Sequence, residues 1–164
     1  MSSYLQLLKE RELIRVEMVC LGNICRSPMA AAVLANRASE IEAPKIIVSS
    51  SGTSSWHVGE SAHLLSEQTW KSVGYSYSHQ ARQFMAERFD EVDLILAMDL
   101  SNHENILNLA RSDEDRAKVA MLRSFDPGAD SVEVPDPWGN EIDAYQEVLV
   151  MVESAVSGLL KTLA

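Results

Sequence analysis

The chain has 164 residues, 46% of them hydrophobic, which is the usual size of a single domain with one continuous core. Its 24 acidic residues outnumber 14 basic ones and give a formal net charge of −10. Because nucleic-acid binding requires clustered Lys and Arg, this balance excludes nucleic acid as a partner. The sequence shows neither a membrane-length apolar run nor a secretory leader, and Cys20 and Cys25 lie too close together to join distant segments. We therefore expect a cytoplasmic protein without a membrane partner.

Helical and strand patterns alternate along the chain. Leucines and charges at helical spacing in residues 1–15 predict a short N-terminal helical extension before the core. Strand-like apolar runs lie at 16–20, 45–50, 92–98 and 119–122, and helical patterns lie at 29–35, 60–73, 84–90, 100–110 and 141–163. This order predicts one α/β domain over residues 1–164, with a parallel sheet covered on both faces. Ligands are expected at the carboxyl ends of its strands.

The segment 20–27, Cys-Leu-Gly-Asn-Ile-Cys-Arg-Ser, joins the first predicted strand to the first predicted helix; we call it the phosphate loop. Such a loop directs backbone N–H groups of Leu21, Gly22, Asn23, Ile24, Cys25, Arg26 and Ser27 at one centre, and the helix dipole favours an anion there. Gly22 and Asn23 tolerate left-handed backbone conformations, and Arg26 offers a planar fork to two phosphate oxygens. The loop therefore predicts a phosphate site.

Cys20 is the candidate nucleophile in this loop. A helix N-terminus and a nearby guanidinium favour a thiolate, which can attack phosphorus. Ser27 is expected either to donate a hydrogen bond to that thiolate or to cap the helix, and the two roles are compatible. No Lys-bearing nucleotide loop and no dinucleotide fingerprint occurs, and the four histidines are too scattered to form a zinc site. We expect no metal and no cofactor.

The run from Val19 to Pro28 resembles the signature of the low-molecular-weight protein tyrosine phosphatases, and matching segments follow at 51–53, 56–59, 78–83, 97–99 and 135–139. The resemblance covers roughly residues 16–160. It implies a three-layer, doubly wound, flavodoxin-like fold with a four-stranded parallel sheet. It also implies hydrolysis of phosphotyrosine and aryl phosphates through a phosphocysteine intermediate. The implied partner is a tyrosine-phosphorylated protein, and the implied inhibitors are phosphate-like oxyanions.

The resemblance implies that Asp136, followed by Pro137, is the general acid that protonates the leaving phenolate. A second Asp-Pro dipeptide, Asp126-Pro127, occurs earlier in the chain. The residues alone do not distinguish the two, because Asp-Pro commonly marks only a turn.

The resemblance further implies that Leu21, Trp56 and Trp138 form apolar walls around the aromatic leaving group. The alternative for each Trp is a place in the core. His57 lies where relatives tune substrate preference; it is otherwise expected to be a surface residue.

Two more positions match residues that support the loop in relatives: Ser50 and His79, which would hydrogen-bond to Asn23. Cys25 matches a second loop cysteine that forms a reversible disulfide with the nucleophile in relatives. The alternative is that Cys25 only fills space, and both interpretations stay open.

Four other functions are compatible with parts of the pattern. An arsenate reductase of this fold would need an external thiol, because the chain has no third cysteine. Some bacterial relatives are protein arginine phosphatases and carry Thr at the position of Ile24, so Ile24 favours tyrosine. A non-catalytic phosphate-binding module would not need Cys20, Arg26 and Asp136 together, and a phosphocysteine carrier would be discharged by Asp136.

Overall fold

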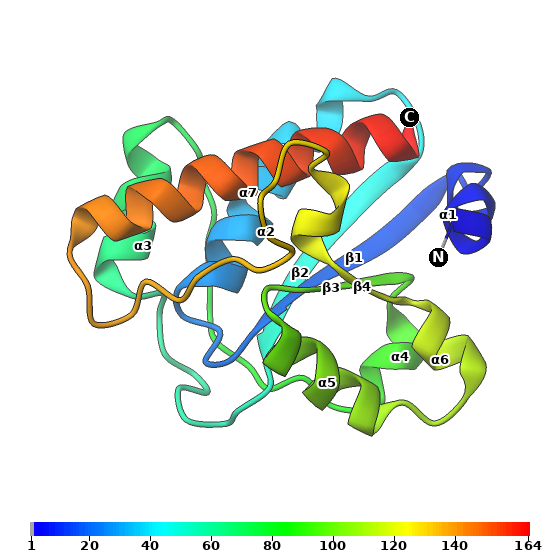
Figure 1. The fold of residues 1–164 in the computed structure, drawn as a ribbon, viewed down its shortest axis with the longest axis horizontal. Coiled ribbons are helices and arrows are strands. Elements are labelled where there is room, and N and C mark those ends of the chain that lie inside the picture. Colours follow the sequence, from blue (N-terminus) through cyan, green and yellow to red (C-terminus); the bar gives the residue numbers. More distant parts are fainter. Residues whose placement is uncertain (1) are drawn as a thin grey trace.

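The computed structural model describes residues 2–164, which form one parallel sheet between two layers of helices (Figure 1). The strands are β1 (Leu13–Cys20), β2 (Lys45–Gly52), β3 (Leu94–Ala97) and β4 (Val119–Met121), in the order β2-β1-β3-β4. All pairings are parallel. The predicted α/β fold with a four-stranded parallel sheet is therefore confirmed.

The main helices cover both faces of this sheet. They are α1 (Ser2–Lys9), α2 (Arg26–Arg37), α3 (Leu64–Ser72), α4 (Arg88–Glu91), α5 (Leu100–Leu109), α6 (Asp113–Ala117) and α7 (Ile142–Leu163), with 3-10 turns η1 (Ala38–Glu40) and η2 (Leu122–Phe125). In Figure 1, α2, α3 and α7 lie over one face, and α4, α5 and α6 lie over the other. No helix of residues 2–164 combines the length and apolarity needed to cross a membrane.

Several predicted boundaries are wrong. Helix α1 ends at Lys9, and β1 already begins at Leu13, because Leu13 pairs with Lys45 at the start of β2. Helix α4 is shorter than predicted, and α6 was not predicted at all. Helix α6 begins after a Ser112 side chain that accepts the Asp115 N–H, so it depends on a local cap rather than on an apolar stripe.

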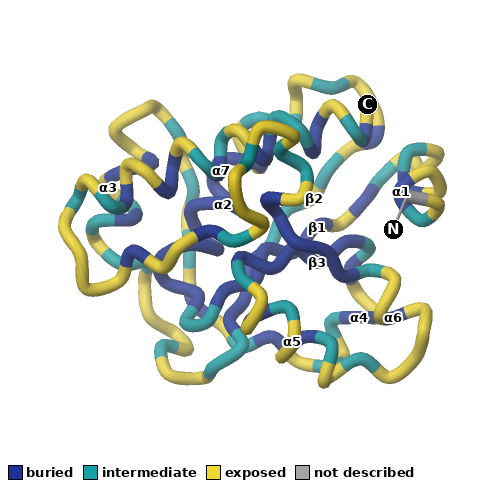
Figure 2. The backbone as a smooth tube through the Cα atoms, in the orientation of Figure 1, coloured by how far each residue is buried: buried dark blue, intermediate teal, exposed yellow. Residues whose placement is uncertain are grey.

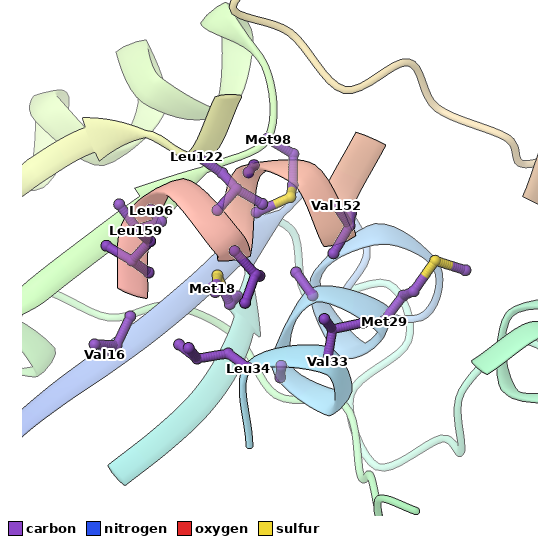
Figure 3. Close-up of a cluster of buried hydrophobic side chains, with 14 of the residues drawn as sticks. Val16, Met18, Met29, Val33, Leu34, Leu96, Met98, Leu122, Val152 and Leu159 are labelled. Atoms are coloured by element: carbon purple, nitrogen blue, oxygen red, sulfur yellow. The ribbon is translucent and has the colours of Figure 1, made fainter. Parts of the chain in front are cut away.

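The larger of the two buried hydrophobic clusters lies between β1 and the helices α2 and α7. Val16 and Met18 point from β1 toward Leu34 of α2 and Leu159 of α7 (Figure 3). Val19 belongs to a second cluster on the opposite face. Figure 2 shows the central strands β1 and β3 largely buried and the outer faces of the helices exposed. Burial on both faces holds β1 rigidly, and its last residue, Cys20, is therefore held as firmly as the sheet itself.

Helix α1 packs at the amino end of β1. Leu8 is fully buried in the main core, and the Tyr4 hydroxyl donates to the backbone carbonyl of Asp93. Arg11, just after the helix, forms an ion pair of 2.6 Å with the Asp93 carboxylate. The N-terminal helix is thus attached to the body of the fold, at the end of β1 opposite to the phosphate loop (Figure 1).

Candidate active site

The phosphate loop lies between the carboxyl end of β1 and the start of α2, at the centre of the sheet. Its backbone carbonyls accept hydrogen bonds from segments outside the loop. Thr53 N donates to the Cys20 carbonyl, and both N and Oγ of Ser54 donate to the Leu21 carbonyl. His79 Nε2 donates to the Asn23 carbonyl, His63 N to the Ile24 carbonyl and Ser66 Oγ to the Cys25 carbonyl. Carbonyls bound from outside leave the N–H groups directed at the loop centre, which is the arrangement of an anion site.

Asn23 has a left-handed backbone, with φ of 56°, and no other non-glycine residue among 2–164 has a positive φ. Gly22 does not have a positive φ, so of the two residue types that tolerate a left-handed conformation only Asn23 adopts it. A Cβ at Gly22 would lie 3.0 Å from His57 Cδ2, so the position is short of space. A side chain at this position would have to push the His57 ring aside slightly, whereas the turn itself is made by Asn23.

Gly52, at the end of β2, lies directly against the loop. A Cβ there would lie 2.7 Å from the carbonyl oxygen of Leu21 and 3.0 Å from the nitrogen of Asn23. Both atoms belong to the backbone, so neither can turn aside. Gly52 lets the loop pass close to β2, a role that the sequence analysis did not assign.

Cys20 is buried, and its Sγ has two polar neighbours. Ser27 Oγ lies 3.0 Å from it, and Asn23 N donates to it at 3.3 Å. Helix α2 begins at Arg26 with Cys25 in the capping position and without a side-chain cap, so the capping role predicted for Ser27 is wrong. Ser27 instead contacts the thiol, in the position expected of a donor to a thiolate.

Asn23 is the centre of the polar network that holds the loop. Its Nδ2 donates to Ser27 Oγ at 2.7 Å and to Ser50 Oγ at 3.0 Å, and its Oδ1 accepts the Arg82 N–H at 3.0 Å. His79 Nε2 lies 2.6 Å from the Asn23 carbonyl oxygen, so this nitrogen carries the proton. Burial lowers the pKa of His79 below its usual 6.5, which favours the neutral ring. The structure thus places Ser50 and His79 around Asn23 as predicted, and adds Arg82.

Arg26 of the phosphate loop is buried, and its guanidinium is held by residues outside the loop. Its Nη1 donates to Asp99 Oδ2 at 2.7 Å and to the Val134 carbonyl at 3.0 Å. Its Nη2 lies 3.7 Å from Asp136 Oδ2. Sequence analysis did not single out Asp99, although it lies two residues past β3, the strand next to β1. Its position could have indicated a role in the site, because ligands bind at the carboxyl ends of parallel strands.

Asp136 and Cys20 line the same cavity, which has a volume of about 190 Å³. Its lining consists of Cys20, Leu21, Gly22, Ile24, Cys25, Arg26, Trp56, His57, Asp136 and Trp138. Asp126 lines a different groove, next to α7, and accepts the Gly128 N–H in a local turn. The structure therefore brings only one of the two Asp-Pro dipeptides to the thiol.

The two tryptophans stand at the mouth of this cavity. Trp56 is 71% exposed and Trp138 is 62% exposed, so neither fills the core. Leu21 and His57 line the same cavity, and His57 Nδ1 lies 2.9 Å from Glu60 Oε2. An apolar, open mouth above a polar, buried end suits a ligand with a flat ring and an anionic tip.

Cys25 faces away from the polar network. Its Sγ lies 3.6 Å from the Tyr145 hydroxyl, and burial raises the pKa of the Cys25 thiol to about 12. Both cysteines are free thiols in this structure. Among residues 2–164 no group of three or more His, Cys, Asp or Glu side chains is placed to hold a metal ion.

Comparison with known proteins gives one consistent result. Residues 15–164 match the model of the low molecular weight phosphotyrosine protein phosphatase family. A low molecular weight protein-tyrosine-phosphatase of Streptomyces coelicolor is 43% identical over 89% of this chain and 91% of its own length.

Solved structures agree. A protein tyrosine phosphatase from Entamoeba histolytica superposes with a TM-score of 0.87 at 31% identity, covering 92% of this chain and 96% of that one. The YwlE arginine phosphatase of Geobacillus stearothermophilus superposes with a TM-score of 0.78, also at 31% identity, with 92% of each chain covered. Given the loop at the end of β1 and the match over residues 15–164, the chain belongs to the low molecular weight phosphotyrosine protein phosphatase family.

Proposed function

We propose that the chain removes phosphate from phosphotyrosine in proteins, with Cys20 as nucleophile, Arg26 and the loop amides as the phosphate site, and Asp136 as general acid. The observation that carries this proposal is that a buried thiol and a guanidinium from the phosphate loop and a carboxylate from a distant segment line one small cavity. An inert binding module would need only the guanidinium and the amides. A cavity with all three groups can turn over its ligand.

In the first step Cys20 Sγ attacks phosphorus, forming the S–P bond as the bond from phosphorus to the phenolic oxygen breaks. Asp136 gives its proton to that oxygen, so a neutral phenol leaves. The amides and Arg26 stabilise the charge on the three equatorial oxygens. Ser27 Oγ, at 3.0 Å from Sγ, supports the negative sulfur before attack.

In the second step water attacks phosphorus and transfers a proton to the Asp136 carboxylate. The S–P bond breaks, the thiolate returns, and inorganic phosphate is released. Asp136 is suited to both transfers because it is reachable from solvent, with 44% of its side chain exposed. Proton transfer of this kind contributes about 10²–10⁴ to the rate.

The walls favour an aromatic ester. The thiol lies at the buried end of the cavity, and Trp56 and Trp138 stand at its mouth, so a phenyl ring can span the depth while stacking on an indole. A phosphoserine side chain has no ring to fill that space. Ile24 lines the cavity with an apolar side chain, which favours tyrosine over the phosphoarginine that the YwlE relative acts on.

Further properties follow from the same site. Phosphate-like oxyanions such as vanadate should compete with substrate, because they fit the same amides. The acidic composition, with a net charge of −10, disfavours nucleic acid as substrate or partner. Two free thiols fit a cytoplasmic, reducing compartment. We treat residues 1–164 as a single phosphatase domain that includes α1.

The test compares binding with turnover. Cys20→Ser should abolish hydrolysis of p-nitrophenyl phosphate and of phosphotyrosine peptides, measured in the presence of a chelator. Binding of inorganic phosphate, measured by calorimetry, should persist because Arg26 and the amides remain. Side-by-side rates on phosphotyrosine, phosphoserine and phosphoarginine peptides then decide the substrate. Residual turnover by Cys20→Ser, or a higher rate on phosphoarginine, would contradict the proposal.

A further inference from the structure

Glu17 is a fully buried carboxylate in the middle of the sheet. It lies on β1, the strand that ends in Cys20, between Ser49 of β2 and Ile95 of β3. None of its surface is exposed to solvent. Val19, on the same side of the strand, packs in an apolar cluster. A charge in such a place is costly unless it is fully paired, so its partners indicate what it is for.

Five hydrogen bonds satisfy the Glu17 carboxylate. Oε1 accepts from Ser49 Oγ at 2.7 Å, Arg82 Nη2 at 2.7 Å and Arg88 Nη2 at 2.8 Å; Oε2 accepts from Ser51 Oγ at 3.2 Å and Arg88 Nε at 3.0 Å. Burial opposes ionisation of Glu17, but the bonds from Arg88, Ser49 and Arg82 prevail and hold its pKa below the usual 4.5. The group is therefore an anion that anchors two arginines.

Arg82 continues from this anchor to the phosphate loop. Its Nε donates to the Ser50 carbonyl at 3.1 Å, and its backbone N–H donates to Asn23 Oδ1 at 3.0 Å. Its own carbonyl accepts the Gly52 N–H at 2.9 Å. Asn23 in turn donates its backbone N–H to Cys20 Sγ at 3.3 Å. A continuous series of contacts thus runs from Glu17 to the thiol.

Arg88 makes no such connection. Apart from Glu17, its guanidinium binds Ser49 Oγ at 3.1 Å and the Glu91 carboxylate, and neither residue belongs to the loop. Both arginines pair with the same carboxylate oxygen at nearly the same distance, 2.7 Å for Arg82 and 2.8 Å for Arg88. The Arg82–Glu17 and Arg88–Glu17 ion pairs are therefore closely similar, but only Arg82 also contacts the phosphate loop.

We infer that Glu17 is a positioning residue for phosphoryl transfer: by holding Arg82, it fixes the left-handed Asn23 and so the alignment of Cys20 and the loop amides. The inference rests on the proposed function of the loop. It assigns Arg82 to the active site through its backbone and side chain, and Arg88 to stability alone. Small displacements of reacting groups cost about 10²-fold in rate, so an anchor outside the cavity can control turnover.

The experiment compares Arg82→Met, Arg88→Met and Glu17→Gln. Each removes one charge from the cluster, and Gln adds an NH₂ donor among groups that already donate. Four quantities are measured: the free energy of unfolding in urea, kcat and KM for p-nitrophenyl phosphate, the rate of Cys20 alkylation by iodoacetamide, and protection of Cys20 by inorganic phosphate.

We expect all three variants to lose stability. Arg82→Met and Glu17→Gln should also lower kcat by about 10- to 100-fold, slow Cys20 alkylation and weaken phosphate protection. Arg88→Met should leave kcat, alkylation and protection unchanged. Because a merely structural cluster would affect the two arginine variants alike, equal effects of Arg82→Met and Arg88→Met would overturn the inference. So would an Arg82→Met enzyme with unaltered kcat and alkylation.

Two controls keep the outcome decisive. If Glu17→Gln does not fold, the arginine pair alone decides, since the Arg82 side chain is 44% exposed and tolerates replacement. If the unmodified protein binds phosphate but does not turn over any phosphate ester, the proposed function fails. Phosphate protection of Cys20 in the same variants still tests whether Glu17 aligns the loop.

Discussion

The phosphate loop and the segment 135–139, which we call the acid loop, meet in one cavity but are held in opposite ways. The phosphate loop is buried, and its carbonyls and Asn23 are bound by residues from distant parts of the chain. The acid loop is mostly exposed, and its hydrogen bonds are local: Trp138 N donates to Asp136 Oδ1, and Asn140 N donates to the Pro137 carbonyl. A site that must hold the same anion through both steps is rigid, whereas a carboxyl that serves two different oxygens keeps its freedom.

The largest effect should come from the acid loop. Asp136→Asn should lower kcat by about 10²–10⁴ for phenyl phosphate, because the phenolate must then leave without a proton. Esters with very acidic leaving groups should slow far less. Asp126→Asn is the matched control, since Asp126 lies in another groove and should leave kcat unchanged. Equal slowing of both ester classes by Asp136→Asn would show that Asp136 is not the acid.

The next largest effect should come from a substitution that displaces the backbone of the phosphate loop. Gly52→Ala places a Cβ 2.7 Å from the Leu21 carbonyl oxygen and should displace the loop. We expect kcat/KM to fall by about 10² and phosphate affinity to fall with it. Gly128→Ala, whose Cβ would meet nothing closer than 3.5 Å, is the control for an added methyl group. Normal kinetics in Gly52→Ala would mean that the loop does not need its close passage along β2.

The aromatic mouth should contribute less. Trp138→Ala removes a stacking surface from aryl substrates and should raise KM for phosphotyrosine peptides about 2- to 10-fold. Inorganic phosphate has no aromatic ring to stack on Trp138, so its inhibition constant should not change. An equal weakening of phosphate would indicate instead that Trp138 shapes the acid loop rather than the ring site.

The smallest effect is expected at Cys25. With its pKa raised to about 12, its thiol is protonated at neutral pH, and alkylation should become appreciable only above about pH 11. Mass spectrometry of protein treated with iodoacetamide at neutral pH should find the label on Cys20 alone. Cys25→Ser should retain near-normal kcat/KM, because a hydroxyl keeps the contact with Tyr145. Rapid labelling of Cys25 would refute this expectation.

The sequence was sufficient for the parts of the site that lie on one continuous segment. Cys20, Asn23 and Arg26 follow one another in the phosphate loop, and the alternation of strands and helices placed that loop at the carboxyl end of a strand in a parallel sheet. Asp136 came only through the family resemblance, because an Asp-Pro pair has the same local meaning at 126 and at 136. The structure separates the two by bringing one of them near Arg26.

The sequence was not sufficient for contacts between distant segments. Nothing local in Ser66 or Thr53 indicates that each binds a carbonyl of the phosphate loop. Ser27 before Pro28 has the composition of a helix cap, yet the helix begins one residue before Ser27. Glu17 did carry an indication: a strand covered on both faces has no solvent side, so a glutamate within it must have buried partners.

The tight passage of α7 over η2 has a consequence for the acid loop. A Cβ at Gly158 would lie 1.8 Å from the Phe125 carbonyl oxygen, so only glycine allows the helix and the turn to lie this close together. Val134 makes two backbone hydrogen bonds: its N–H donates to the Met98 carbonyl, and its carbonyl accepts from Arg26 Nη1. The acid loop therefore follows a residue that is hydrogen-bonded to the end of β3 and to Arg26, and it leads into α7, which packs against η2. With Asp136 as the proposed acid, we expect its position to be adjusted within the stretch between Val134 and Ile142, without disturbing the sheet.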